Sequence, residues 1–309
     1  MNVVIVASDQ LLEQIKQYYS SELDHENNIP HTKFVVTTKD LKVIAYQSNK
    51  VMFQGKDASK QASLWEAQSM LNIAVSPSEK AIKNNNCFVV TNESEHIGSD
   101  EVGTGDYFGP VVVCASYLNE DIVKQVSQLN LQDSKKLDDF QIRELAKTLK
   151  KIVPHVVYVL DNKKYNEAIM ANNLNVIKAK MHNYVLLKLI KLIDKKPMVV
   201  VDQFCLPETY YSYLKDTKNV VDNICFETKA EDKYLAVAIA SIIARDAFLA
   251  QMDQISDKIG MKIQKGASDL VDTQGVEIIK THGWAIMNDI AKLHFVNTQK
   301  IKDKIKQEE

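Results

Sequence analysis

Two adjacent carboxylates, Asp100 and Glu101, stand at the end of an extended segment and immediately before a glycine-punctuated turn. The turn contains Gly103 and Gly105, and an apolar segment, 111–117, follows it. Carboxylates at the end of a buried strand are costly unless a cation or a proton compensates them. Glycines let backbone amides approach a bulky group such as a phosphate or a sugar. The pattern predicts a divalent-metal site facing a nucleic-acid backbone, although an acidic pair beside a turn is also typical of a solvated strand end.

Further acids stand at the boundaries of other predicted elements. Asp202 closes the short apolar run 198–201, which favours a buried strand. Glu231 and Asp232 precede an alanine-rich segment, 235–245, typical of a helix that packs closely on a sheet. Each of these acids is also explained as a helix cap. Taken together, four such acids can hold two Mg²⁺ or Mn²⁺ ions, which activate a water and stabilise the leaving oxygen of a phosphodiester.

Three segments of the chain resemble the type 2 ribonuclease H family, which comprises ribonucleases HII and HIII. Residues 97–117 resemble the family's signature segment, and 133–137 (Asp-Ser-Lys-Lys-Leu) resemble a second element. Residues 229–244 resemble its segment of a lysine, a small residue and an acid, followed by an alanine-rich helix. The resemblance covers about residues 95–300 in ordered blocks. It implies an endoribonuclease that cleaves the RNA strand of RNA–DNA hybrids and leaves 5′-phosphate and 3′-hydroxyl ends.

Within the family, the sequence is more similar to ribonuclease HIII than to ribonuclease HII. Ribonuclease HII has Gly-Arg-Gly where this chain has Gly103-Thr104-Gly105, and it has Asp where this chain has Glu231. The late segment 265–298 is also HIII-like and has no convincing equivalent of the junction-sensing tyrosine of HII. Two alternatives remain: incision at single ribonucleotides in duplex DNA, as in HII, and binding of hybrids without catalysis.

The resemblance assigns roles to individual residues. It implies metal ligands at Asp100, Glu101, Asp202 and Glu231, with Asp232 as the alternative for the fourth. It implies backbone contacts with 2′-hydroxyl groups, which distinguish RNA from DNA, at Gly103, Thr104 and Gly105. Phosphate contacts are implied for Lys135 and Lys136.

These residues require a scaffold that brings distant segments together, and the predicted fold class is α/β. A ribonuclease H-like mixed sheet is expected, with Asp100 in its first strand and 111–117 antiparallel beside it. Further strands are expected at 156–160, 198–202 and 224–228. Helices that flank the sheet on both faces are expected at 139–151, 165–171, 176–193, 208–215 and 232–252.

The N-terminal part is predicted to be a separate α+β unit. Strands are expected at 3–6, 34–38, 41–47 and 50–54, and helices at 11–19 and 57–71. This order resembles the small TATA-box-binding-protein-like domain that precedes the catalytic domain of ribonuclease HIII. We therefore expect a substrate-binding domain at 1–75, a linker at 76–86 and a catalytic domain at 87–309.

Residues 33–60 carry six lysines and two aspartates, with aromatic residues between them. Lys50, Phe53 and Lys56 are the candidates for contact with nucleic acid in this unit. Strand alternation requires part of the aromatic residues to be core, and lysines on an exposed sheet also serve solubility.

The composition is that of an ordinary globular protein, with 309 residues, 45% hydrophobic residues and a net charge of −2. That charge does not indicate a nucleic-acid binder, so a local basic surface is required. The four cysteines have no CxxC spacing and are expected to be reduced thiols. Residues 1–6 lack a cationic region, and we expect no signal peptide and no segment long enough to span a membrane. A cytoplasmic, monomeric enzyme is the expectation.

Overall fold

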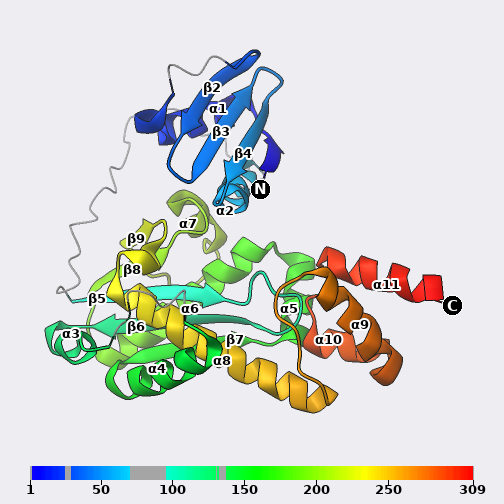
Figure 1. The fold of residues 1–309 in the computed structure, drawn as a ribbon. Helices are drawn as coiled ribbons and strands as arrows, with labels where there is room; N and C mark the ends of the chain where they lie inside the picture. The colour runs from blue at the N-terminus through cyan, green and yellow to red at the C-terminus, as the bar shows by residue number, and fades with distance from the viewer. Residues whose placement is uncertain (1, 25–28, 70–94, 130, 132–136, 309) are drawn as a thin grey trace. The chain divides into compact units, whose positions relative to one another are not determined.

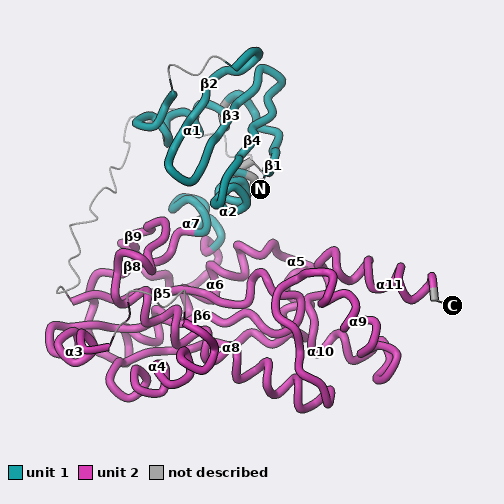
Figure 2. Tube along the Cα trace, in the orientation of Figure 1, with its two compact units in different colours: residues 1–82, 204–213 teal, residues 83–203, 214–309 magenta. Residues whose placement is uncertain are grey.

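The computed structural model describes residues 2–24, 29–69, 95–129, 131 and 137–308. The chain divides into two compact units, residues 1–82 with 204–213, and residues 83–203 with 214–309 (Figure 2). The predicted linker, 76–86, lies outside the described residues.

The first unit contains one four-stranded antiparallel sheet in the order β1-β4-β3-β2 (Figure 1). All six predicted elements are present, with bounds close to those expected from alternation and helical periodicity. Their bounds are β1 Asn2–Val6, α1 Asp9–Tyr18, β2 Thr32–Thr37, β3 Leu41–Tyr46, β4 Lys50–Gly55 and α2 Ala58–Ser69. A short 3₁₀ helix, η1, spans Ser20–Glu22, and α7 (Pro207–Tyr213) groups with this unit.

Strand alternation separates the two faces of this sheet. Val43 and Phe53 are directly paired and fully buried, and α2 packs on β1 and β4. Val4 and Val6 of β1 are 52% and 71% exposed. Phe53 therefore belongs to the core, and its prediction as a substrate contact is wrong, because the alternation that places it opposite Val43 directs its ring into the protein.

The second unit contains a mixed five-stranded sheet in the order β7-β6-β5-β8-β9. The strands are β5 His96–Val102, β6 Val111–Leu118, β7 His155–Leu160, β8 Met198–Asp202 and β9 Ile224–Glu227. β6 is antiparallel to β5 and β7, whereas β8 is parallel to β5 and β9. This confirms the predicted strands and the antiparallel return beside β5.

Helices cover both faces of this sheet. α6 (Leu174–Ile193) packs on β5, β6 and β7, and α8 (Leu235–Ile259) packs on the other face, with α4 (Asp139–Ile152) behind it (Figure 1). Gly98 of β5 allows the close approach of α8, since an added Cβ would lie 2.2 Å from the backbone nitrogen of Val237. The stripe of small residues predicted for α8 lies at this contact, and Ala236, Ala240 and Ala244 are buried.

The expectation that no segment is long enough to cross a membrane is wrong for α8. This helix has 25 residues and a mean hydropathy of 1.6 in its most apolar window, which meets the length and composition of a span. That window is 61% buried inside the protein. The apolar surface of α8 is therefore explained by its position between the sheet and α4.

The rest of the second unit consists of shorter helices, of which α3, α9 and α10 were not predicted. The predicted helix near residue 165 is α5 (Asn162–Ala171). The C-terminal helix is anchored by Ile301, which is fully buried, and a Cβ on Gly275 would lie 2.3 Å from its side chain. The remaining elements are α3 Glu120–Val126, η3 Ala230–Asp232, α9 Asp269–His282, η4 Trp284–Ile286, α10 Met287–Ile290 and α11 Val296–Glu308.

The cysteines differ in part from the prediction of four reduced thiols. Cys114 and Cys205 are free and buried, as expected. Cys225 is disulfide-bonded, which corrects the prediction for this residue. Local spacing does not reveal such a bond, because disulfide pairing depends on distances set by the tertiary fold.

Candidate active site

Asp100 and Asp202 are brought together at the ends of two neighbouring parallel strands. β5 and β8 pair with Ser99 opposite Val201, so that the next residue of each strand is an aspartate. Adjacent strands lie about 4.8 Å apart. Both side chains are largely buried, with exposed fractions of 8% for Asp100 and 9% for Asp202. Two acids separated by about a hundred residues in the chain thus share one edge of the sheet.

Hydrogen bonds fix both carboxylates. Oδ1 of Asp100 accepts a bond of 2.8 Å from the backbone N–H of Glu101, and the side chain of Ser241 in α8 lowers the pKa of this carboxylate. Oδ1 of Asp202 accepts a bond of 3.0 Å from the backbone N–H of Ala230. This second bond ties the end of β8 to the first residue of η3, which is immediately followed by Glu231.

Asp100 and Asp202 are two buried negative charges that lie close together, an arrangement that a bound cation would stabilise. Burial, followed by the negative charges of Glu101 and Asp202, raises the pKa of Asp100 well above its usual range. A divalent ion between hard oxygen donors reverses this penalty. The donor set of Asp100 and Asp202 therefore fits the magnesium or manganese site predicted from the sequence.

Glu101 has different surroundings from Asp100, because neighbouring residues of a strand point to opposite faces. Its carboxylate accepts bonds from Nζ of Lys178 at 2.5 Å and from Nε2 of His182 at 2.9 Å, both on α6. Nδ1 of His182 in turn lies 2.8 Å from Oγ of Ser99. Burial by itself would raise the pKa of Glu101, but the charge of Lys178 and the contacts with His182 outweigh it and lower the pKa to about 2.

Lys178 and His182 are site residues that the sequence analysis missed. Both are buried, with exposed fractions of 7% and 0%. They stand four residues apart on one face of an otherwise apolar helix, a spacing that places both side chains on the same side of it. A lysine and a histidine at this spacing in an apolar pattern are the signal that could have indicated a buried partner for an acid.

The fourth predicted ligand lies in η3. Glu231 is half-buried, with a buried Oε2 atom, whereas its neighbour Asp232 is exposed. The bond between Ala230 and Asp202 brings the backbone next to Glu231 to the end of β8. Within residues 2–24, 29–69, 95–129, 131 and 137–308, no three His, Cys, Asp or Glu side chains form a group arranged to hold a metal ion. The assignment of Glu231 as a ligand thus stays a prediction, and its burial favours it over Asp232.

The glycine turn after β5 contains two glycines of different kinds. Gly103 has a φ of +91°, and an added Cβ would lie 2.3 Å from the carbonyl oxygen of Pro110, so the fold itself requires glycine there. Gly105 is exposed, and an added Cβ would meet nothing within 4 Å. Thr104 between them is half-buried. Since the fold leaves open space at Gly105, this position is free for a ligand to approach the backbone.

The other predicted substrate contacts lie away from the acids or outside the described residues. Lys135 and Lys136 belong to 132–136, which the structure does not describe. Lys50 and Lys56 are exposed residues of the first unit. Their roles stay predictions.

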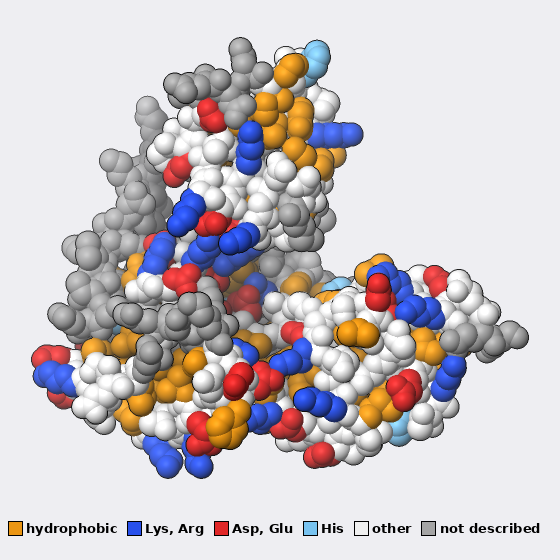
Figure 3. Space-filling model, viewed as in Figure 1, with side chains coloured by type: hydrophobic (Ala, Val, Ile, Leu, Met, Phe, Trp, Pro, Cys, Tyr) orange, Lys and Arg blue, Asp and Glu red, His pale blue; other side chains and the backbone are white. Residues whose placement is uncertain are grey.

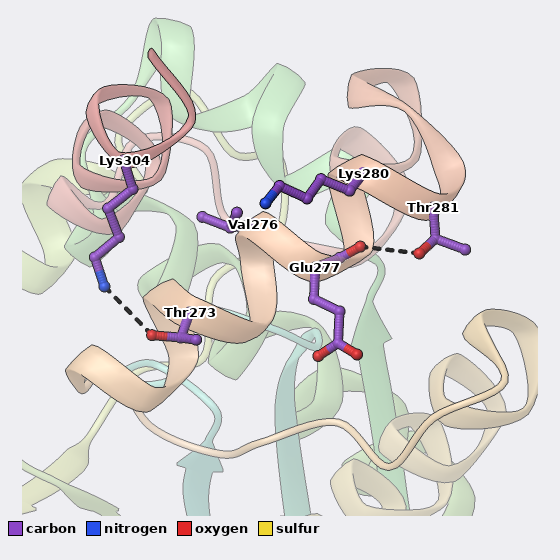
Figure 4. Close-up of a pocket in the computed structure, with 6 residues that line it drawn as sticks. All are labelled: Thr273, Val276, Glu277, Lys280, Thr281 and Lys304. Carbon is purple, nitrogen blue, oxygen red and sulfur yellow. Dashed lines mark hydrogen bonds between the residues drawn. The ribbon is translucent and has the colours of Figure 1, made fainter. Parts of the chain in front are cut away.

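A cavity of about 630 Å³ lies between α9 and α11, away from the acids (Figure 4). Lys304 donates a hydrogen bond of 3.3 Å to Oγ1 of Thr273 across it, and Glu277 and Lys280 also line it. None of the predicted site residues lines this cavity. The acidic pair therefore lies at a strand edge and not in this pocket.

Comparison with known proteins identifies the family of this chain. A family model described as Ribonuclease HII matches residues 97–298, which contain β8, β5 apart from its first residue, and all four predicted metal ligands. A second model, Domain of unknown function (DUF3378), matches residues 2–74. The chain is 39% identical over 309 residues to Ribonuclease HIII of Bacillus mycoides, with 97% of each protein covered. The chain belongs to the ribonuclease HIII family.

Other members of the ribonuclease HIII family match over the same length. Ribonuclease HIII of Enterococcus faecalis is 36% identical, with 97% of each chain covered. Among solved structures, Bst-RNase HIII in complex with Mn²⁺ is 36% identical, with a TM-score of 0.68 over 99% of this chain and 100% of that chain. RNase H3 of Aquifex aeolicus is 26% identical, with a TM-score of 0.53 over 94% and 99% of the two chains. These matches confirm the predicted family and the α/β fold.

Proposed function

We propose that this protein is an endoribonuclease that cleaves the RNA strand of RNA–DNA hybrids by metal-dependent hydrolysis. The observation that carries the proposal is the pairing of Asp100 and Asp202 at adjacent strand ends. Both are buried, and their repulsion helps to raise the pKa of Asp100, a penalty that a bound divalent cation relieves. Membership of the ribonuclease HIII family and the Mn²⁺ bound by Bst-RNase HIII support it.

In this proposal Asp100, Glu101, Asp202 and Glu231 hold two Mg²⁺ or Mn²⁺ ions. When bound, such ions would supply an activated water and stabilisation of the leaving 3′-oxygen of the RNA, and the products would carry 5′-phosphate and 3′-hydroxyl ends. Asp100 and Asp202 supply oxygen donors at one strand edge. Lys178 and His182 keep the carboxylate of Glu101 ionised and fix its orientation.

Recognition of RNA is assigned to the turn after β5. The open space at Gly105 lets a ribose approach the backbone of Gly103, Thr104 and Gly105, whose amides and carbonyls can bond to 2′-hydroxyl groups. Lys135 and Lys136 contact phosphates in the same proposal. Lys50 and Lys56 of the first unit add attraction to the backbone of the duplex.

Cleavage assays on two substrates test this function. One substrate is a uniform RNA–DNA hybrid, and the other is duplex DNA with a single embedded ribonucleotide, each with Mg²⁺ and then with Mn²⁺. We expect cleavage of the hybrid by the wild type and a loss of orders of magnitude in Asp202→Asn, which keeps the oxygen that accepts the bond from Ala230 but removes the charge.

Binding of the hybrid should persist in Asp202→Asn, and this measurement is the control for folding. Preferred incision at the single ribonucleotide would instead assign the activity of ribonuclease HII. Binding without cleavage by the wild type would identify a hybrid-binding protein and contradict the proposal.

A further inference from the structure

The turn that carries Gly105 continues into a segment, 106–109, that is held by the C-terminal part of the chain. The backbone N–H of Tyr107 donates to the carbonyl of Gly266 at 2.9 Å, and the backbone N–H of Gly266 donates to Oδ1 of Asp106 at 2.6 Å. The backbone N–H of Gly109 donates to the carbonyl of Ile290 at 2.8 Å. The loop before α9 and the end of α10 thus fix the backbone that follows the glycine turn.

Lys292 lies at the centre of these contacts and is fully buried. Its Nζ donates to the carbonyl of Asp106 at 2.8 Å and to the carbonyl of Gly109 at 2.5 Å. Its backbone N–H donates to the carbonyl of Tyr107 at 2.8 Å. A single residue therefore joins both ends of the segment, because each carbonyl points to the same ammonium group.

Burying the charge of a lysine costs free energy, and the hydrogen bonds of Lys292 offset that cost. Burial lowers the pKa of Lys292 to about 7, and the charge of nearby Asp106 only partly opposes this. An apolar residue of the same length would fill the same space without that penalty. Two backbone carbonyls pointing inward need a donor, and a lysine can satisfy both.

Asn162, the first residue of α5, supplies a second donor to the same segment. Its Nδ2 donates to the carbonyl of Gly109 at 2.8 Å, and the side chain is 2% exposed. The bond of Lys292 to Asp106 has no such duplicate among the described contacts, and Asp106 follows Gly105 directly. Lys292 therefore restrains the carbonyl of Asp106, while the backbone N–H of Gly266 holds the side chain of the same residue.

We propose that Lys292 is a positioning residue for RNA recognition: it holds the Asp106–Gly109 segment so that the backbone of Gly103, Thr104 and Gly105 faces the 2′-hydroxyl groups of the substrate. This inference rests on the proposed function. The lysine acts through the turn and touches no reacting atom. Loss of Lys292 should therefore weaken the preference for RNA over DNA. It should leave the metal site unchanged, because Asp100 and Asp202 are held by other bonds.

The test is Lys292→Met, which keeps the length of the side chain and removes both donors. Two constants are measured for each protein: the KM for the RNA–DNA hybrid, and the inhibition constant of an all-DNA duplex of the same sequence. We expect the KM for the hybrid to rise about tenfold or more, as for the loss of a hydrogen bond from a charged group, while the inhibition constant of the DNA duplex stays unchanged. Asn162→Ala, which removes one donor, should change the KM in the same direction by a smaller factor.

Leu149→Ala is the matched control, because Leu149 is a fully buried residue of α4 that lies outside the turn contacts. It should lower stability and leave the ratio of the two constants unchanged. The role of Lys292 would be overturned if Lys292→Met cleaves hybrids and its ratio of the hybrid KM to the inhibition constant of the DNA duplex equals that of the wild type. A wild type that fails to cleave hybrids would instead overturn the proposed function. If Lys292→Met does not fold, the ratio in Asn162→Ala decides the question.

Discussion

At the scale of single residues, strand alternation gives two neighbouring acids opposite chemistry. Asp100 points towards α8 and faces Asp202, which with burial raises its pKa. Glu101 points towards α6 and meets Lys178 and His182, which lower its pKa to about 2 in spite of burial. Burial and neighbouring negative charges thus disfavour the charged form of Asp100, whereas Lys178 and His182 favour the charged form of Glu101. This division cannot be seen from the adjacent letters of the sequence.

The neighbours Glu231 and Asp232 provide a matched pair of variants. Glu231→Gln should abolish cleavage, because the residue follows directly after the backbone N–H that bonds to Asp202. Asp232→Asn should retain most activity and cost at most about 1 kcal/mol of stability, as for a lost cap. Cleavage rates and urea unfolding of both variants check this. If Asp232→Asn abolishes cleavage and Glu231→Gln retains it, the fourth ligand is Asp232.

The two glycines of the turn provide a second pair. Gly105→Ala should change the free energy of unfolding by less than about 0.5 kcal/mol, because its Cβ meets open space. Its KM for the hybrid should nevertheless rise, because the methyl group occupies the path of the ribose. Gly103→Ala should lower the free energy of unfolding by more than about 1 kcal/mol, through its φ of +91° and the carbonyl of Pro110. A normal KM in Gly105→Ala would exclude close approach of the substrate at that residue.

At the scale of elements, α6 serves as an electrostatic support for β5. It buries Lys178 and His182 against the face of the strand that carries Ser99 and Glu101. α8 serves as an apolar support on the other face, where Gly98 and the alanine stripe permit close packing. The end of β5 thus has polar partners on one face and close apolar packing on the other. These contacts hold the strand that carries Asp100 and Glu101.

Lys178→Met should destabilise the metal-free protein by about 3 kcal/mol at pH 7, because it leaves the carboxylate of Glu101 buried without its cation. In the wild type the lowered pKa of Glu101 contributes stability above pH 4.5, and this contribution is lost as the pH falls towards 2. The variant lacks this contribution, so the difference between the two proteins should narrow as the pH falls through that range.

Urea unfolding in the presence of a chelator, from pH 7 to pH 3, measures the difference between Lys178→Met and the wild type. Lys180→Met is the control on the same helix, because Lys180 is exposed. It should unfold like the wild type at every pH. A difference for Lys178→Met that stays constant with pH would show that Lys178 does not compensate Glu101.

At the scale of the whole molecule, the net charge is only −2, so the protein as a whole does not attract a polyanion. On the face of the second unit seen in Figure 3, acidic and basic side chains are interspersed. Binding of a polyanion therefore depends on local groups and on metal ions. The first unit offers such groups, since Lys50 and Lys56 are exposed.

Removal of residues 1–85, which include all of the first unit except 204–213, should weaken binding of the hybrid and leave the chemical step largely intact. A fragment that starts near residue 86 retains the five-stranded sheet and all proposed ligands, so it should keep most of kcat. Its KM for the hybrid should rise strongly and depend less on salt, because lysine–phosphate contacts are lost. Lys50→Gln with Lys56→Gln in the full chain should reproduce part of this effect. If the KM of the fragment and its dependence on salt concentration equal those of the full chain, the first unit has no role in binding.

Much of this fold was predictable because its signals are local. Alternation in 41–46 and 50–55 and the apolar run 198–201 predicted strands, and the alanine stripe after residue 235 predicted a closely packed helix. The family motifs identified Asp100 and Asp202 as candidate ligands. α9 and α10 were missed because their apolar residues pack on segments that are distant in the chain and leave no clear local period.

By itself, the sequence determined most of the helices and strands and the family, and it identified the candidate acids, since each depends on residue types at short spacing. Only the tertiary structure decided which partner each side chain has. It placed Lys178 and His182 on Glu101, Lys292 on the turn after β5, and Phe53 in the core. The physical reason is that burial and charge compensation depend on distances in space. Alternation predicts that two residues lie on opposite faces of a strand, but the packing of helices decides which face is buried and what charge it meets.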